Sequence, residues 1–213
     1  MKYDLHVHSK YSSDGYVEPE LMVKTAKKRG LDGIAVTDHD TIKGGLLAEK
    51  FQDTDFQVIV GCEVTSNQGE IIGLFLNQEI VSKNHLEVMD EIKEQGGLVI
   101  IPHPFDTLRR STYQPRGEFM KNVDNIEVFN SRCIHQKYNL QAAAFAMDNK
   151  LGVSAGSDAH FVNEIGNAGI ITEDDVMKSL KDNNLETFGK RSSIFNHCFT
   201  TMLKIWRKQL NNK

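Results

Sequence analysis

Two histidines lie two positions apart near the start of the chain, in the stretch DLHVHS. Tyr3, Leu5 and Val7 alternate with polar residues, which is the period of a β-strand, so His6 and His8 are expected on one face. Their Cα atoms would be about 6.5–7 Å apart. Imidazoles at that spacing can converge on one metal ion, at about 2.0–2.1 Å each for zinc. Polar side chains on an exposed edge strand would give the same pattern, so the pair alone leaves both interpretations open.

Further side chains that can bind metal stand where other apolar runs end. Each follows or closes a stretch such as LDGIAV or LVII, the usual composition of a buried strand. They are His39, Glu63, His103, Asp158 and His160, and Asn130 has the same place after IEVF. In a parallel barrel the carboxyl ends of the strands meet on one rim, where barrel active sites are built. This placement predicts a metal site on that rim.

The apolar runs alternate with amphipathic segments along almost the whole chain, which is typical of an α/β fold. Pro19 in a first turn and Gly30 as a stop delimit one helix, and the turn at 67–69 indicates a hairpin. Further helices are expected from Thr41 onward, over 82–95 and over 135–149. Such alternation favours a parallel sheet, open or closed. Because it continues along the chain, we expect a single-domain barrel.

The chain of 213 residues is long enough for one domain with a substantial core. Its net charge of −4 is not that of a protein built to hold nucleic acid electrostatically. The three cysteines lie far apart with no CxxC pair, which suits a reducing compartment. The sequence starts with a charged strand and not with the apolar segment of a signal peptide. No apolar run is close to the length of a membrane-spanning helix, which is about 20 residues. A cytoplasmic protein without a transmembrane segment is therefore expected.

The motifs DLHVHS with Asp14, TDHDT, GCE, PHPF and GSDAH occur in this order and resemble those of the PHP (polymerase and histidinol phosphatase) family. The resemblance covers Lys2 to about Gly169. It implies a distorted, seven-stranded β/α barrel that binds two or three divalent ions and hydrolyses phosphate esters. The ions in the family are zinc, manganese or iron. We expect this metal-dependent hydrolase domain to occupy residues 1–190.

The resemblance also implies which residues hold the ions. The ligands of the first ion would be His6, His8, Glu63 and Asp158. Glu63 would bridge to a second ion that His103 also holds, and those for a third ion are Asp14, His39 and His160. Several family members have another ligand for the second ion, commonly histidine, where this chain has Asn130. An amide oxygen is a poorer ligand for a borderline metal, so we expect a weaker second site.

A divalent ion lowers the pKa of its bound water from 15.7 to about 7, so a metal-bound hydroxide can attack a phosphate ester. The residues expected to carry this catalysis are His6, His8, Glu63, His103, Asp158 and His160. Charge on the phosphoryl oxygens calls for cationic partners, and arginine matches phosphate bidentately. Arg109, Arg110 and Arg132 lie on loops that leave two of the strands. We expect at least one to bind substrate; a solvated or salt-bridged arginine is the alternative for each.

The leading hypothesis is a phosphomonoesterase that acts on a small phosphorylated metabolite, by analogy with the histidinol and nucleotide phosphatases of the family. A 3′–5′ exonuclease would use the same chemistry, but a chain with a net charge of −4 is poorly suited to tracking single strands. A metal-binding regulatory module without turnover is the alternative from another functional class.

Residues 191–213 differ from the rest in charge and pattern. After Glu186 the chain has basic residues and no acidic ones. The apolar residues that recur at helical spacing are Phe195, Phe199, Met202, Leu203 and Trp206. We expect an amphipathic helix that packs its apolar stripe on the body or on a second copy of the chain. A basic helix that touches a membrane surface or nucleic acid is the alternative.

Overall fold

The computed structural model describes residues 1–109, 111–113, 115 and 118–211. Its strands are β1 (Lys2–Val7), β2 (Gly33–Val36), β3 (Gln57–Ser66), β4 (Gly69–Leu74), β5 (Leu98–Ile101), β6 (Asn125–Asn130), β7 (Gly152–Gly156), β8 (Ala168–Ile171) and β9 (Glu186–Gly189). They form one sheet in the order β7-β6-β5-β4-β3-β2-β1-β8-β9. The first seven strands are therefore neighbours in chain order, as successive strand–helix units require.

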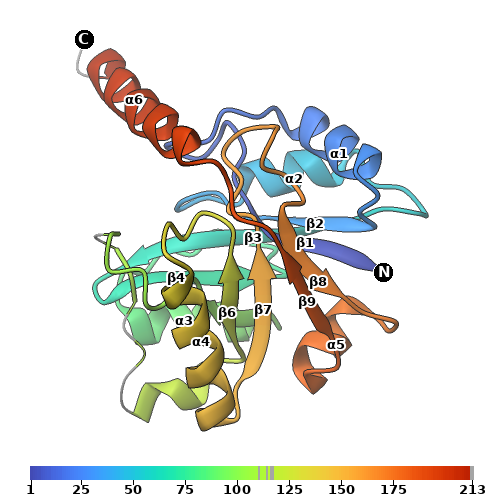
Figure 1. Cartoon of the computed structure of the whole chain (residues 1–213), viewed down its shortest axis with the longest axis vertical. Coiled ribbons are helices and arrows are strands. Elements are labelled where there is room, and N and C mark those ends of the chain that lie inside the picture. The colour runs from blue at the N-terminus through green and yellow to red at the C-terminus, as the bar shows by residue number, and fades with distance from the viewer. Residues whose placement is uncertain (110, 114, 116–117, 212–213) are drawn as a thin grey trace.

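The sheet curves until β1 approaches the end of β7, which makes a nearly closed barrel (Figure 1). Val7 and Ala159 form a parallel bridge there, and the His8 amide donates to the Ala159 carbonyl at 2.8 Å. Gly156 permits this approach, because a Cβ at that position would lie 2.3 Å from the His6 Cβ. The closure brings the two ends of the candidate site, near residues 6–8 and 158–160, together.

The expected α/β barrel is confirmed in outline, whereas the sheet has nine strands among the described residues and not the expected seven. The additional strands are β8 and β9, an antiparallel pair that extends the sheet from β1. The sheet is also not parallel throughout. Strand β4 is antiparallel to both β3 and β5, so its first residues lie at the rim where those strands end.

The helices are α1 (Pro19–Lys28), α2 (Lys43–Glu49), α3 (His85–Glu94), α4 (Gln136–Asn149), α5 (Val176–Asp182) and α6 (Ile194–Asn211), with a 3₁₀ turn over Glu118–Asn122. Pro19 begins α1 as expected, and Met22, Val23 and Ala26 are buried on one face. Helix α3 begins later than expected, since the Asn84 side chain accepts the capping hydrogen bond from the Leu86 amide. Within the described residues, no helix is both long and apolar enough to cross a membrane.

Strand β1 does not alternate along its whole length. Its pairing with β2 shifts by one residue between Asp4 and Val7, which is a β-bulge. The Asp4 carboxylate therefore accepts hydrogen bonds from the Ser157 and Gly166 amides, at 2.8 and 2.7 Å, and lies apart from the histidine pair. Beyond the bulge, His6 and His8 point into the same space. The shared face of the two histidines is confirmed, whereas the regular alternation expected along this strand is interrupted between Asp4 and Val7.

Candidate metal centre

The implied metal ligands all lie at one rim of the barrel, although they come from distant parts of the chain. His6 lies on β1 and Glu63 on β3, and the others follow strands or lie in the loop before α1; these are His8, Asp14, His39, His103, Asp158 and His160. All are buried except His39, which is partly exposed. Histidines and carboxylates are rarely buried unless they are paired or bind metal. The arrangement thus concentrates imidazole and carboxylate groups in a space that water scarcely reaches.

Glu63 and Asp158 both approach the ring nitrogens of His6 and His8. His6 Nε2 lies 3.0 Å from His8 Nε2 and 3.3 Å from Glu63 Oε2. His8 Nε2 lies 3.3 Å from both Glu63 Oε2 and Asp158 Oδ1, and His6 Nε2 lies 3.7 Å from Asp158 Oδ1. Tetrahedral bonds of about 2.0–2.1 Å place ligand atoms about 3.3 Å apart. The buried Asp158 Oδ1 has no hydrogen-bond partner. His6, His8 and Asp158 thus form a group that could hold a divalent ion, and Glu63 lies against both histidines.

A second set of side chains surrounds Asp14. Its Oδ2 lies 2.9 Å from His160 Nε2 and 3.4 Å from His39 Nε2, and His8 can offer a further ligand atom. Burial lowers the pKa of His160 to about 3, so this imidazole is neutral, the form that binds metal. Burial also lowers the pKa of His39, but Glu63 and Asp14 outweigh it and raise that pKa to about 10. The carboxylates here attract positive charge strongly.

Glu63 joins the histidines on its two sides. Its Oε2 faces His6 and His8, whereas its Oε1 lies 3.1 Å from His103 Nε2. Burial raises the pKa of Glu63, but His6 and His39 outweigh this effect and hold the pKa well below its usual value. An ionised carboxylate with its oxygens directed to separate imidazoles is suited to bridging two ions.

Glu70 is a candidate ligand that the sequence analysis missed. Its oxygens lie 3.7 Å from His103 Nε2 and 3.9 Å from His39 Nδ1, and with His39 and Glu63 it forms a further group that could hold an ion. Burial, followed by the charge of Glu63, raises its pKa. Glu70 is near the start of β4, and only the reversed direction of that strand brings it to the rim.

Glu127 was also missed and supports the site from behind. It lies within β6, and His6 Nδ1 donates to its Oε1 at 2.9 Å. Its Oε2 accepts a hydrogen bond from the His103 amide, also at 2.9 Å. A carboxylate that holds one imidazole nitrogen leaves the other free to bind metal. A lone glutamate inside the apolar run IEVF was the available sequence signal.

Two of the candidate ligands lie on unusual backbone. His103 has φ +31° and Asp158 has φ +55°, in the left-handed region that residues with a Cβ rarely adopt. Such conformations persist where the surroundings impose them, and they cluster at functional sites. The surrounding hydrogen bonds show the constraint at His103, whose amide is held by Glu127. The structure thus fixes both side chains at the rim through the backbone.

Arg109 and Arg132 make more ion pairs and hydrogen bonds within the protein than is usual for loop arginines. Arg109 donates from Nη2 to Asp158 Oδ2 at 2.6 Å and from Nε to Asp106 Oδ2 at 3.1 Å. Arg132 is buried, and it lies 3.6 Å from Glu164 Oε1 and donates to Thr200 Oγ1 at 2.8 Å. Arg110 lies outside the described residues. Both described arginines nevertheless line the cavity beside the candidate ligands.

Asn130 lies beside the centre with its amide already used by protein partners. Its Nδ2 donates to Glu127 Oε2 at 3.0 Å and to Asp158 Oδ2 at 3.2 Å. Its Oδ1 accepts from the Arg132 amide at 2.8 Å and from Arg109 at 3.4 Å. The side chain therefore braces Asp158. Besides Glu63, the acidic group that faces His103 is Glu70.

A cavity of about 540 Å³ lies beside the candidate metal centre. The barrel lines it with Asp14, His39, Glu70, Leu108, Arg109, Ser111, Arg132 and His160, and α6 lines it with His197, Thr200, Thr201 and Lys204. Candidate ligands and cations thus face one space of the size that binds small molecules. Such a site can hold ions and an anionic ligand together.

Comparison with known proteins agrees with this geometry. The model of the PHP domain family matches residues 4–193. The protein MJ0417 of Methanocaldococcus jannaschii is 40% identical over 174 residues, which cover 79% of this chain and 69% of that protein. A 5′-3′ exoribonuclease of Haemophilus influenzae is 31% identical over 123 residues, which cover 49% of this chain and 43% of that enzyme.

A solved structure shares the fold. It is a two-domain protein of Bacteroides vulgatus that contains a predicted PHP-like metal-dependent phosphoesterase. The superposition has a TM-score of 0.75 at 21% identity and covers 89% of this chain and 65% of the other.

Proposed function

The chain belongs to the PHP domain family, and from that premise we propose that it is a metal-dependent phosphomonoesterase for small phosphorylated metabolites. The observation that carries the proposal is the approach of the Glu63 and Asp158 carboxylates to the Nε2 atoms of His6 and His8, at 3.3–3.7 Å, close to the spacing of atoms that share one metal ion. A histidinol-phosphatase-like or nucleotide-phosphatase-like enzyme would use this arrangement.

We assign the ligands by their distances. The first ion would be held by His6, His8, Glu63 and Asp158, the second by Glu63, Glu70 and His103, and the third by Asp14, His39 and His160. This donor set of imidazoles and carboxylates suits zinc, manganese or iron. Two or three such ions would lower the pKa of bound water and neutralise phosphoryl charge.

The protein's own side chains support the reaction in other ways. Glu127 fixes the ring of His6, and Asn130 and Arg109 hold Asp158 through its Oδ2, away from the oxygen that faces the histidines. Burial raises the pKa of Asp158, but Arg109 and His6 outweigh it, so the carboxylate remains ionised. The buried setting also strengthens the attraction between the centre and a phosphate. Positioning and electrostatics are the protein's main contributions here.

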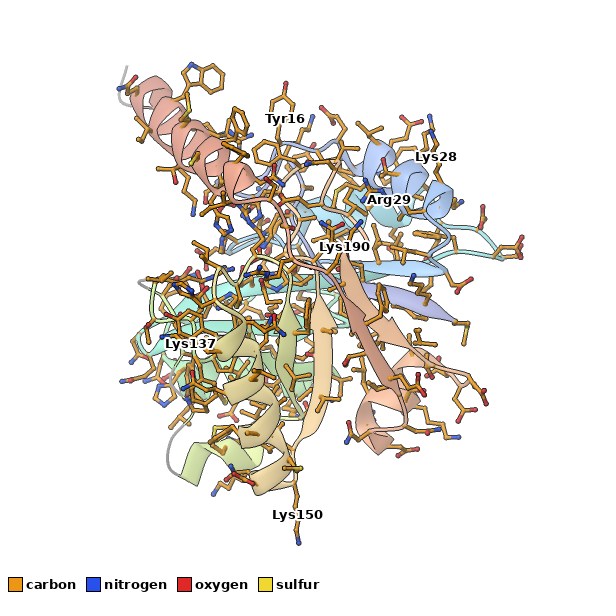
Figure 2. All side chains as sticks on the ribbon, in the orientation of Figure 1. Tyr16, Lys28, Arg29, Lys137, Lys150 and Lys190 are labelled. Atoms are coloured by element: carbon orange, nitrogen blue, oxygen red, sulfur yellow. The ribbon has the colours of Figure 1, made fainter. Side chains whose placement is uncertain are left out.

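Nuclease activity is the main alternative, since one partial relative is a 5′-3′ exoribonuclease. The charge distribution favours a small substrate over a long strand. The net charge is −4, and Lys28, Lys137 and Lys150 project outward from widely separated places (Figure 2). Proteins that track single strands combine a continuous basic groove with aromatic platforms. A regulatory module without turnover is the third possibility, and its test is the same.

The experiment compares phosphate release from a panel of phosphomonoesters with degradation of single-stranded DNA and RNA, using manganese-loaded protein. The proposal expects phosphate release from monoesters, abolished in Asp158→Asn and retained in Asp148→Asn, an exposed control on α4. Degradation of oligonucleotides in preference to monoesters would establish the nuclease. Metal binding without either activity would establish the regulatory module.

A further inference from the structure

Helix α6 starts where the family match ends. The match covers residues 4–193, and α6 spans Ile194–Asn211. The helix nevertheless touches the candidate metal centre. Lys204 Nζ lies 2.7 Å from Asp14 Oδ2, Arg207 donates to the Ser12 carbonyl at 2.7 Å, and Thr200 accepts from Arg132. An element outside the family match thus reaches the loops that carry the site (Figure 1).

Most of the apolar side chains of α6 are exposed, although Leu203 is half-buried and the Phe199 ring contacts the edge of Phe161 with centroids 6.3 Å apart. Phe195, Phe199, Met202 and Trp206 have exposed fractions of 56–70%. The helix directs polar and basic side chains to the cavity instead. The described part of α6 is therefore not held in place mainly by packing of its apolar stripe on the body. Packing of that stripe against a second copy of the chain stays a prediction. The polar face has a role that packing does not explain.

We propose that α6 is a substrate-binding wall of the metal centre, and that Lys204 binds the phosphate of the substrate. This inference rests on the proposed function and assigns part of its substrate site to a segment outside the family match. The four α6 residues that line the cavity, His197, Thr200, Thr201 and Lys204, face the same space as the proposed ligands Asp14, His39, Glu70 and His160.

The contact of Lys204 explains why its charge becomes available to a ligand. Lys204 lies on Asp14 Oδ2, the oxygen that also faces His160 and His39, whereas Oδ1 accepts from Ser12. A divalent ion on Oδ2 would repel the ammonium, because like charges at such distances are unfavourable. The side chain is half exposed and has room to turn. A phosphate in the cavity would give the ammonium a new anionic partner.

The two described arginines of the cavity are placed differently. Arg109 contacts Asp158 through Oδ2, whereas the histidines face Oδ1, so an ion on Oδ1 leaves that pair in place. Arg109 also keeps Asp106, and Arg132 keeps Glu164 and Thr200. Lys204 differs from the two described arginines in one respect. The oxygen it contacts, Asp14 Oδ2, is the same oxygen that faces the proposed metal ligands His39 and His160.

The test measures binding of inorganic phosphate to the manganese-loaded protein by calorimetry. Lys204→Met should weaken phosphate binding by about tenfold or more, the usual effect of losing a hydrogen bond to a charged group. Lys204→Arg should retain most of the affinity. Lys181→Met, at an exposed position on α5, is the matched control and should bind phosphate as the wild type does. With a hydrolysed monoester, Lys204→Met should raise KM more than it lowers kcat.

A separate measurement shows whether Lys204→Met displaces α6 as a whole, because displacement of the helix would also weaken phosphate binding. Trp206 is the chain's single tryptophan and lies on α6, so acrylamide quenching of its fluorescence reports whether the helix stays in place. Equal quenching in wild type and Lys204→Met assigns the lost affinity to the ammonium. If quenching increases, Thr201→Lys is added to Lys204→Met, which returns an ammonium to the same cavity one turn away. Recovery of phosphate binding supports the proposal, and no recovery overturns it.

Unchanged phosphate affinity in Lys204→Met would also overturn the proposal, as would equal loss in Lys204→Met and Lys204→Arg. These results are distinguishable from failure of the proposed function. A protein that hydrolyses no monoester but binds phosphate through Lys204 loses the function and keeps this site. A protein that hydrolyses monoesters with the same KM in Lys204→Met keeps the function and loses this site.

Discussion

Glu127 Oε1 lies 2.9 Å from His6 Nδ1, so the imidazole donates this hydrogen bond and presents Nε2 to His8, Glu63 and Asp158. The contact links the interior of β6 to the proposed first ion. Since β6 itself provides none of the assigned ligands, Glu127 acts through the orientation of His6.

Glu127→Gln should therefore weaken metal binding by about 10–100-fold, as found when a group that orients a ligand is altered. The neutral amide oxygen accepts a weaker hydrogen bond than the carboxylate does, and without the negative charge the His6 imidazole is a less basic ligand. Competition with a chelator measures the affinity, and Glu94→Gln at an exposed position of α3 is the control. Equal affinity in Glu127→Gln and wild type would refute the orienting role.

His8 belongs to two of the possible metal groups, one with His6 and Asp158 and one with Asp14, His39 and His160. We expect purified wild-type protein to carry two or three divalent ions per chain, and His8→Ala to carry fewer than Asp14→Ala. The reason is that Asp14 belongs to one of those groups and His8 to both. Elemental analysis measures the content. Full metal content in both variants would contradict the ligand assignment.

Arg109→Ala should lower stability as well as turnover. An exposed loop arginine would change the free energy of unfolding by less than about 0.5 kcal/mol. Arg109 instead holds the buried Asp158 at 2.6 Å, so its removal leaves a buried carboxylate short of a partner. The expected loss is about 1–3 kcal/mol in urea unfolding of the metal-free protein. A change below 0.5 kcal/mol would show that the ion pair contributes little.

Asn130→His tests whether this position can serve as a ligand. The amide now donates to Glu127 and Asp158 and accepts from the Arg132 amide. An imidazole has fewer donors and acceptors than this environment uses, so we expect lower stability and no tighter metal binding. Metal titration of stripped protein, with thermal unfolding alongside, decides the matter. Tighter binding and a shift toward zinc would show that the histidine reaches the second ion.

The sequence predicted the first seven strands and the residues that gather at the rim, because apolar runs and their polar ends are local patterns. The pattern of polar residues at the carboxyl ends of parallel strands does not include Glu70, because β4 runs in the opposite direction and brings its first residues to the rim. Local sequence indicated a hairpin at 67–69, and the contact between Glu70 and His103 appears only when β4 pairs with β5.

Two other features depend on tertiary structure in a similar way. The bulge in β1 separates Asp4 from the histidine face, and no turn residue marks it in the sequence. The pattern of α6 predicted an amphipathic helix packed on the body or on a second copy; Phe195 and Trp206 are exposed in the single chain, and packing on a second copy stays a prediction. Cations on that helix are held by Asp14 and the Ser12 carbonyl, which lie nearly the whole chain away. Long-range ion pairs of this kind leave no periodic signal.

We propose that the clustered histidines and carboxylates form a metal centre that hydrolyses phosphomonoesters. The most direct test of this proposal is the release of inorganic phosphate from a monoester panel by one preparation, first stripped with a chelator and then reloaded with manganese. We expect no release by the stripped protein, recovery on reloading, and no recovery in Asp158→Asn. Equal release before and after stripping, or full recovery in Asp158→Asn, would contradict it.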